Sequence, residues 1–236
     1  MTPPIDESML WTREGSTLFM TALESLTDDQ LKAPSVLEGW SRRHVAAHTA
    51  ANADGLRNLV HWARTGEERP MYASMEARDA DIKSGAKLPS HDLRTWVAMA
   101  SDAIIADLED LTGEQWEAPV RTRQGTEVKA RAIPWMRARE VMIHAVDLDA
   151  GISFDALPVG FLGALVNETA AQRSLAADVP AVVLRHGDDE WVIDGSGEPT
   201  VLYGSLGTIA AYLVGRAHDG LVDAVGNAAP ALPAWL

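Results

Sequence analysis

Two short stretches decide the fold of this chain, because both place metal-binding side chains on helices. The first is Trp40-Ser41-Arg42-Arg43-His44-Val45-Ala46-Ala47-His48, and the second is Arg139-Glu140-Val141-Met142-Ile143-His144. Glu140 and His144 are four residues apart, so on a helix they lie one above the other on a single face. His48 lies on a helical face that is otherwise apolar. The two stretches therefore predict a helix bundle that holds a divalent metal in its interior.

The predicted ligands have the chemistry of a catalytic rather than a structural metal site. Two histidines and one glutamate form a donor set that zinc accepts, although other divalent ions accept it as well. Three protein ligands leave one coordination position open, which is typical of a catalytic site. The competing interpretation is that Glu140 is a buried carboxylate paired with a neighbouring arginine, such as Arg137, Arg139 or Arg131.

His44 adds an ambiguity to the first stretch. It precedes His48 by four residues, so the two could form a helical pair of histidine ligands. Ser41, however, is a suitable N-cap for this helix, which places His44 in a partly solvated first turn. The remaining histidines, His61, His91, His186 and His218, have unremarkable spacing, and we expect them at surface or satisfied positions.

Helical periodicity continues on both sides of these stretches up to about residue 150. The apolar spacing predicts helices over residues 7–26, from Ser41 to about Arg64 before Gly66, from a Ser90 cap onward, and over 134–150 with Pro134 in the first turn. A short helix around 74–83 and an extended pair either side of Gln124-Gly125 are also expected. Four long helices favour a four-helix bundle over residues 1–152.

After Gly151 the pattern changes to short strands flanked by helices. A helix is expected around 157–175, then strands at 181–185, 191–193 and 200–203, and a last helix from a Ser205 cap to about Arg216. This predicts a small α+β domain with an antiparallel sheet over residues 153–236, and an α+β, mainly α fold class for the whole chain.

Composition excludes several classes of function. The 236 residues are 47% hydrophobic, which is ample for a core, and no apolar run is long enough to span a membrane. The net charge of −14 argues against nucleic acid or an anionic membrane as a partner. The start, from Met1 to Ser8, lacks the pattern of a signal peptide, so we expect a cytoplasmic protein. Nothing indicates an obligate interface, and a monomer is expected.

The chain contains no cysteine. Disulfides, thiolate ligands and a protein-borne thiol nucleophile are therefore excluded. If the chemistry needs a thiol, a cofactor must supply it.

Several motifs together resemble a known family. Leu37-Glu38-Gly39-Trp40-Ser41, followed by His44 and His48, is similar to the second-helix signature of DinB-like metal-binding bundles. The similarity to mycothiol-dependent maleylpyruvate isomerases is closer and extends into both halves of the chain. It is carried by residues 58–68, Pro70-Met71-Tyr72, residues 135–148, Gly204-Ser205-Leu206 and Gly215-Arg216 with Asp219-Gly220.

This resemblance implies a function and a set of roles. It implies zinc held by His48, Glu140 and His144, no ligand role for His44, a catalytic or substrate-binding role for Arg216, and a sterol-carrier-like second domain. The implied reaction is the mycothiol-dependent cis–trans isomerisation of 3-maleylpyruvate to 3-fumarylpyruvate in gentisate-type aromatic degradation. The implied partners are thus a small dianionic substrate and a low-molecular-weight thiol.

Two further residues are candidates for binding the substrate or the thiol. Arg78 suits the second carboxylate of a dianion, although a solvated surface arginine is the competing interpretation. Asn52, one turn after His48, either faces the pocket or is a core amide. The residues leave open whether the metal binds the thiol or polarises the substrate. They also leave open a mycothiol S-transferase, a metal-dependent hydrolase and a non-catalytic binding module on the same scaffold.

Overall fold

The computed structural model describes residues 2–233, and these divide into two compact units, Thr2–Ile152 and the residues from Ser153 onward. The first unit is helical with a small β-hairpin, and the second is α+β, so the α+β, mainly α fold class is confirmed. None of the helices among the described residues is long and apolar enough to cross a membrane.

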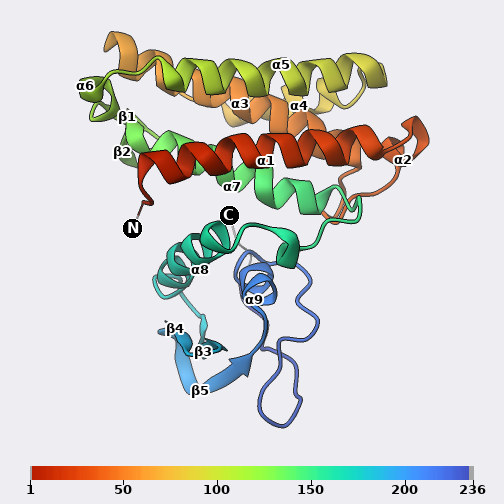
Figure 1. The fold of residues 1–236 in the computed structure, drawn as a ribbon, viewed down its shortest axis with the longest axis vertical. Coiled ribbons are helices and arrows are strands. Elements are labelled where there is room, and N and C mark those ends of the chain that lie inside the picture. Colours follow the sequence, from red (N-terminus) through yellow and green to blue (C-terminus); the bar gives the residue numbers. More distant parts are fainter. Residues whose placement is uncertain (1, 234–236) are drawn as a thin grey trace. The chain divides into compact units, whose positions relative to one another are not determined.

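Four long helices form a bundle in the first unit (Figure 1). They are α1 (Ile5–Ser25), α3 (Arg42–Thr65), α5 (Ser90–Glu109) and α7 (Ile133–Asp147). α1 packs mainly against α7 and α5, and α3 packs mainly against α5 and α7, which closes a four-sided bundle. Their inward faces are apolar, with fully buried side chains such as Leu23, Leu56 and Ile104. Burial of these faces stabilises the helices more than intrinsic propensity does.

The termini of α3 show why the chain is helical between Ser41 and Gly66. Ser41 is the N-cap, as predicted, and Gly66 ends the helix in the left-handed conformation at φ 75°. The helix start also defines the role of His44, whose Nδ1 lies 3.2 Å from the Ser41 backbone nitrogen and 2.8 Å from Ser41 Oγ. These contacts complete a capping box, so His44 stabilises the first turn of α3.

Shorter elements connect the bundle helices. α2 (Asp28–Lys32) lies between α1 and α3, and α4 (Met75–Gly85) packs on α3. α6 (Gly113–Trp116) is followed by the antiparallel pair β1 (Pro119–Arg121) and β2 (Glu127–Lys129) and by the 3-10 turn η1 (Ala130–Ala132). The predicted short helix and extended pair are therefore present. Ser90 is the first residue of α5 rather than its cap, because Pro89 holds the N-cap position.

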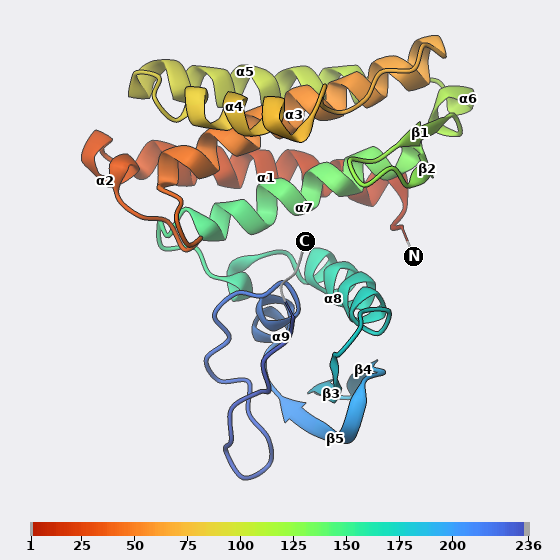
Figure 2. The same ribbon diagram turned by 180° about the vertical axis from the view of Figure 1, so that it is seen from behind.

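The second unit consists of a three-stranded sheet and two helices (Figure 2). Its elements are η2 (Phe154–Ala156), α8 (Val159–Arg173), β3 (Pro180–His186), β4 (Asp189–Ile193), β5 (Ser196–Tyr203) and α9 (Leu206–Leu213). β4 pairs antiparallel with β3, as predicted. β5 pairs parallel with β3 on its other side, so the sheet is mixed rather than wholly antiparallel. The sterol-carrier-like character of this unit stays a prediction.

Buried arginine anchors the helices of the second unit. Arg173, at the end of α8, donates from Nε and Nη2 to the carbonyl oxygen of Leu213, at 2.9 and 2.8 Å. Leu213 ends α9, where carbonyl groups have no partner within the helix and the helix dipole attracts a cation. Ser205 caps the start of α9 by accepting a hydrogen bond from the Thr208 backbone at 3.1 Å. The predicted helix is thus correct at its start but ends three residues before Arg216.

Candidate metal centre

The structure brings His48, Glu140 and His144 together inside the bundle. α3 carries His48, and α7, which packs against α3, carries the other two one turn apart. Glu140 Oε2 lies 3.0 Å from His48 Nε2 and 3.3 Å from His144 Nε2. One potential ligand atom from each residue lies within 4.8 Å of those of the other two. No other group of three such residues occurs in residues 2–233.

This geometry fits a divalent metal. Ligand atoms bound at about 2.0–2.2 Å to one ion lie roughly 3–3.5 Å from each other, and both histidines meet the glutamate oxygen at such distances. The two imidazole rings meet edge to face, with ring centroids 4.8 Å apart and planes at 86°. The His48 and His144 side chains are only 9% and 12% exposed, whereas Glu140 is 31% exposed. The site thus retains an opening on the side of the carboxylate.

The electrostatics of the three groups differ. Burial alone would raise the pKa of Glu140, but hydrogen bonds with His144 and His48 hold it well below its usual range. Burial lowers the pKa of His48 in spite of the neighbouring carboxylate. Burial would also lower the pKa of His144, yet hydrogen bonds with Asp147 and Glu140 raise it to about 9. At neutral pH the cluster therefore consists of an anion, a neutral imidazole and a protonated one.

Arg78 lies beside the cluster, although thirty residues separate it from His48. Its Nη2 is 3.2 Å from His48 Nδ1 and its Nη1 is 2.9 Å from Asp79. The guanidinium also stacks over Tyr72, with its carbon 5.9 Å from the ring centroid. The Arg78 side chain is only 13% exposed, so it is not a solvated surface arginine.

Asn52 lies deeper in the bundle and faces Arg137. Its Oδ1 accepts a hydrogen bond from Arg137 Nη1 at 3.0 Å, and Arg137 also donates to Thr49 O and Ser101 Oγ, at 2.7 and 3.1 Å. Arg137 is fully buried, and burial lowers its pKa to about 10. The contact of Asn52 fits the interpretation of a core amide. Arg137 is therefore engaged with α3 and α5, and Arg131 with Glu117.

Sequence reasoning missed three residues that shape the cluster. Trp40 packs edge to face on His48, with centroids 5.5 Å apart. Tyr72 lies under Arg78, and burial raises the pKa of its phenol. Asp147 contacts His144 Nδ1 at 2.9 Å. Asp147 follows His144 by three residues on one helix, a spacing that signals contact. Trp40 and Tyr72 have no such spacing to a ligand, since tertiary packing brings them to the cluster, although both stand in motifs that carry the family resemblance.

Arg216 belongs to the second unit. It lies in the bend after α9, is half-buried, and donates from Nη1 to Val214 O at 2.8 Å. Its own carbonyl oxygen lies 2.9 Å from His218 Nδ1.

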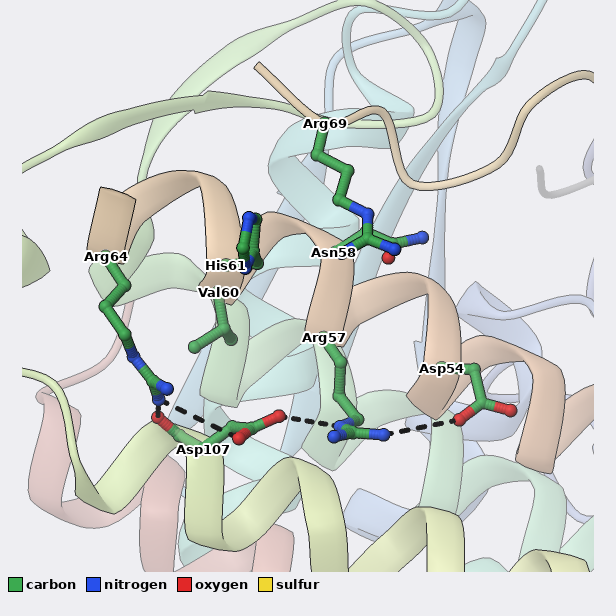
Figure 3. A pocket seen from close by; sticks show the side chains of 8 residues that line it. All are labelled: Asp54, Arg57, Asn58, Val60, His61, Arg64, Arg69 and Asp107. Carbon is green, nitrogen blue, oxygen red and sulfur yellow. Dashed lines mark hydrogen bonds and ion pairs between the residues drawn. The ribbon is translucent and has the colours of Figure 1, made fainter. Parts of the chain in front are cut away.

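A separate hollow of about 440 Å³ lies on the outer face of α3 (Figure 3). Arg57 follows His48 by nine residues, so the two point in opposite directions from the helix. Asp107 of α5 lies between Arg57 and Arg64, and Arg57 reaches on toward Asp54. The charges of Asp54 and Asp107 thus pair with arginines of the same hollow. The ion pairs of Arg57 and Arg64 with Asp107 connect α3 to α5. We assign this hollow no part in the metal cluster.

Comparisons with known proteins agree with the geometry. The family model for the mycothiol maleylpyruvate isomerase N-terminal domain matches residues 12–149. The crystal structure of the mycothiol-dependent maleylpyruvate isomerase is 34% identical, with a TM-score of 0.92 over 99% of this chain and 98% of that chain. A mutant of that enzyme with one histidine changed to alanine is 33% identical, with a TM-score of 0.91 over 99% and 98% of the two chains.

Other comparisons add little. YfiT from Bacillus subtilis, described as a probable metal-dependent hydrolase with an unusual four-helix bundle topology, is 19% identical, with a TM-score of 0.49 over 61% of this chain and 85% of that chain. No curated protein matches significantly. The family match covers more than half of the sequence, and the similarity to the solved isomerase covers nearly all of it. The chain therefore belongs to the mycothiol-dependent maleylpyruvate isomerase family of enzymes.

Proposed function

We propose that this protein isomerises 3-maleylpyruvate to 3-fumarylpyruvate with the help of mycothiol, as a step of gentisate-type aromatic degradation. The similarity to the solved isomerase over nearly the whole chain, at 34% identity, is the observation that carries the proposal. The absence of cysteine agrees with it, because rotation about a carbon–carbon double bond needs a reversible addition, and this chain has no thiol to add.

We further propose that His48, Glu140 and His144 hold Zn²⁺ or another divalent ion. Both histidines direct Nε2 toward the same Glu140 oxygen, and the pKa of this carboxyl group is held well below its usual range. When bound there, a divalent ion supplies Lewis acidity, which either lowers the pKa of a coordinated thiol or polarises a substrate oxygen. The partial exposure of Glu140 would give a small molecule access to an ion held by the three residues.

Arg78 is the residue of the first unit that we propose for binding a substrate carboxylate. A neutral His48 that binds a metal through Nε2 carries its proton on Nδ1, the atom that faces Arg78. A guanidinium only donates hydrogen bonds, so Arg78 cannot bond to an Nδ1 that also carries a proton. Its N–H groups are then available for an acceptor on the substrate, such as a carboxylate. Tyr72 and Asp79 hold the side chain in place.

We propose Arg216 as a catalytic residue on the strength of the family resemblance. A planar guanidinium binds a carboxylate or an enolate-like oxygen with two parallel hydrogen bonds. Asn52 is a weaker candidate for substrate binding than Arg78, because its side-chain oxygen already accepts a hydrogen bond from Arg137.

The proposal is tested by following maleylpyruvate loss and fumarylpyruvate formation with zinc-loaded protein, with and without mycothiol. We expect turnover that requires the thiol and falls at least ~100-fold in His48→Ala and in Arg216→Ala, as for loss of an electrostatic group in the transition state. His61→Ala on the outer face of α3 and Arg185→Ala on β3 are matched controls and keep full activity. Turnover without any thiol, or S-conjugation or hydrolysis instead of isomerisation, would contradict the proposal.

A further inference from the structure

Asp147, the last residue of α7, is an acidic residue that is completely buried. It is 0% exposed, and among residues 2–233 it is the only aspartate or glutamate in the buried class. A buried carboxylate is costly unless hydrogen bonds and an opposite charge offset its loss of water. Its location at a helix C-terminus is a further cost, because the helix dipole is negative there. The contacts of the Asp147 side chain must therefore offset both costs.

The side chain of Asp147 contacts His144, one turn earlier on the same helix. Oδ2 of Asp147 lies 2.9 Å from Nδ1 of His144. An ionised carboxylate only accepts hydrogen bonds, so Nδ1 of His144 carries a proton and donates it. In a neutral imidazole this leaves the lone pair on Nε2, the atom that lies 3.3 Å from Glu140 Oε2. Asp147 thus selects the tautomer in which Nε2 can bind a metal.

The Nδ1 atoms of the two histidines face groups of different charge, a cation at His48 and an anion at His144. His48 Nδ1 faces the Arg78 guanidinium at 3.2 Å, whereas His144 Nδ1 faces the buried Asp147 carboxylate. Only the second contact increases the electron density on the imidazole and restrains its ring with a hydrogen bond that persists on metal binding. The backbone contact of Asp147, from Val36 N to its carbonyl oxygen at 3.2 Å, does not depend on the side chain.

We propose that Asp147 is a positioning residue for the metal centre, which orients His144 through Nδ1 and strengthens Nε2 as a ligand. This inference rests on the proposed metal site of His48, Glu140 and His144. In this role Asp147 acts through His144 and is not one of the three proposed ligands.

The test measures metal affinity in the full-length protein rather than activity. Zinc binding is measured by competition with a chromophoric chelator, and cobalt binding by the visible spectrum that reports ligand geometry. At about pH 9.5, where the His144 imidazole of the wild type is largely neutral and protons no longer compete with the metal, we expect Asp147→Asn, which keeps the shape but loses the charge, to bind zinc about 10- to 100-fold more weakly than the wild type. Asp149→Asn is the control, since Asp149 is exposed, pairs with Arg42 and lies just beyond α7. It keeps wild-type affinity.

The outcomes separate this inference from the proposal on which it rests. If the wild type binds no metal, or if His48→Ala binds as well as the wild type, the proposed metal site itself fails. If the wild type binds through His48 and Asp147→Asn binds within twofold of it, the role of Asp147 is overturned.

A measurement on the wild type guards against a variant that fails to fold. In zinc-loaded protein with ¹⁵N-labelled histidine, we expect His144 to keep its proton on Nδ1 and to bind the metal through Nε2. Metal binding through Nδ1 of His144 would overturn the inference, whatever the variants do.

Discussion

At the scale of single residues, the raised pKa of His144 predicts how metal binding depends on pH. This pKa is about 9, so at pH 7 the imidazole is protonated, and a metal must displace one proton to bind it. His48 has a lowered pKa and Glu140 a pKa well below its usual range, so neither releases a proton near neutrality. We expect the affinity for zinc to rise about tenfold per pH unit up to about pH 9 and then to level off.

The measurement is calorimetric titration with zinc at pH 7 in two buffers of different ionisation enthalpy, which counts the protons released. The expected count is one per metal, and a count of zero would contradict the assignment. The same pKa shift acts on the metal-free fold in the opposite direction. Its stabilising contribution is fully present below the usual histidine pKa of 6.5 and is lost as the pH rises through about 9.

Arg78 gives a second prediction at this scale, because its proposed partner is the substrate and not the metal. We expect Arg78→Gln to raise KM for maleylpyruvate about tenfold or more, as for loss of one charge-assisted hydrogen bond, and to leave zinc affinity within a few-fold of the wild type. Lys83→Gln, an exposed cation further along α4, is the control and leaves KM unchanged. An unchanged KM in Arg78→Gln would remove Arg78 from the substrate site.

At the scale of elements, the crossing from β4 to β5 depends on Gly195. The chain passes across the start of β3 there, and a Cβ on Gly195 would meet the backbone of Val179 and Pro180. We expect Gly195→Ala to lower the free energy of unfolding by about 1–3 kcal/mol, as for other overpacked sites. Gly163→Ala is the matched control, since its Cβ meets nothing within 4 Å in the middle of α8. It stabilises by about 0.5–1 kcal/mol. Urea unfolding measures the free energy of unfolding of both variants. Equal changes in the two would contradict the claim that the crossing from β4 to β5 requires glycine at position 195.

The same elements show what the sequence could predict. The long helices were predicted correctly from their apolar periodicity. Both ends of α3 were predicted correctly as well, because Ser41 is a specific signal for a helix start and Gly66 for a helix end. α2 and α6 were missed, since helices of five and four residues show no periodicity. Both carry a capping-box signature, Thr27 with Gln30 and Thr112 with Gln115, that would have located them. No local sequence pattern predicts that β5 pairs parallel with β3, because this pairing depends on the edge of β3 against which the chain packs after β4.

The candidate site was predictable only where local geometry determines it. The helical faces selected His48, Glu140 and His144, and the structure brings these three together. The position of Arg78 at His48 was not predictable, because Arg78 lies on a different helix, α4, and an irregular connection separates α4 from α3. Arg216 was selected by resemblance alone, and its role stays a prediction.

At the scale of the whole molecule, the net charge of −14 opposes the approach of the proposed dianionic substrate. Arginines at the site attract the substrate only at short range, whereas the overall field repels it over the Debye length, which is about 30 Å at 0.01 M salt and about 8 Å at 0.15 M. Added salt therefore weakens the long-range repulsion more than the short-range attraction. We expect kcat/KM for maleylpyruvate to rise severalfold as sodium chloride increases from about 0.01 to 0.15 M.

The repulsion is a property of the overall charge, so the salt dependence has its own control. Replacing exposed acidic residues on α1 and α5, such as Glu14, Glu24 and Asp102, with their amides reduces the net charge and leaves the helices of the cluster, α3 and α7, unchanged. This variant should have a higher kcat/KM than the wild type at low salt and the same value at high salt. If kcat/KM instead falls with salt in both proteins, the local arginines dominate the encounter and the overall charge does not limit it.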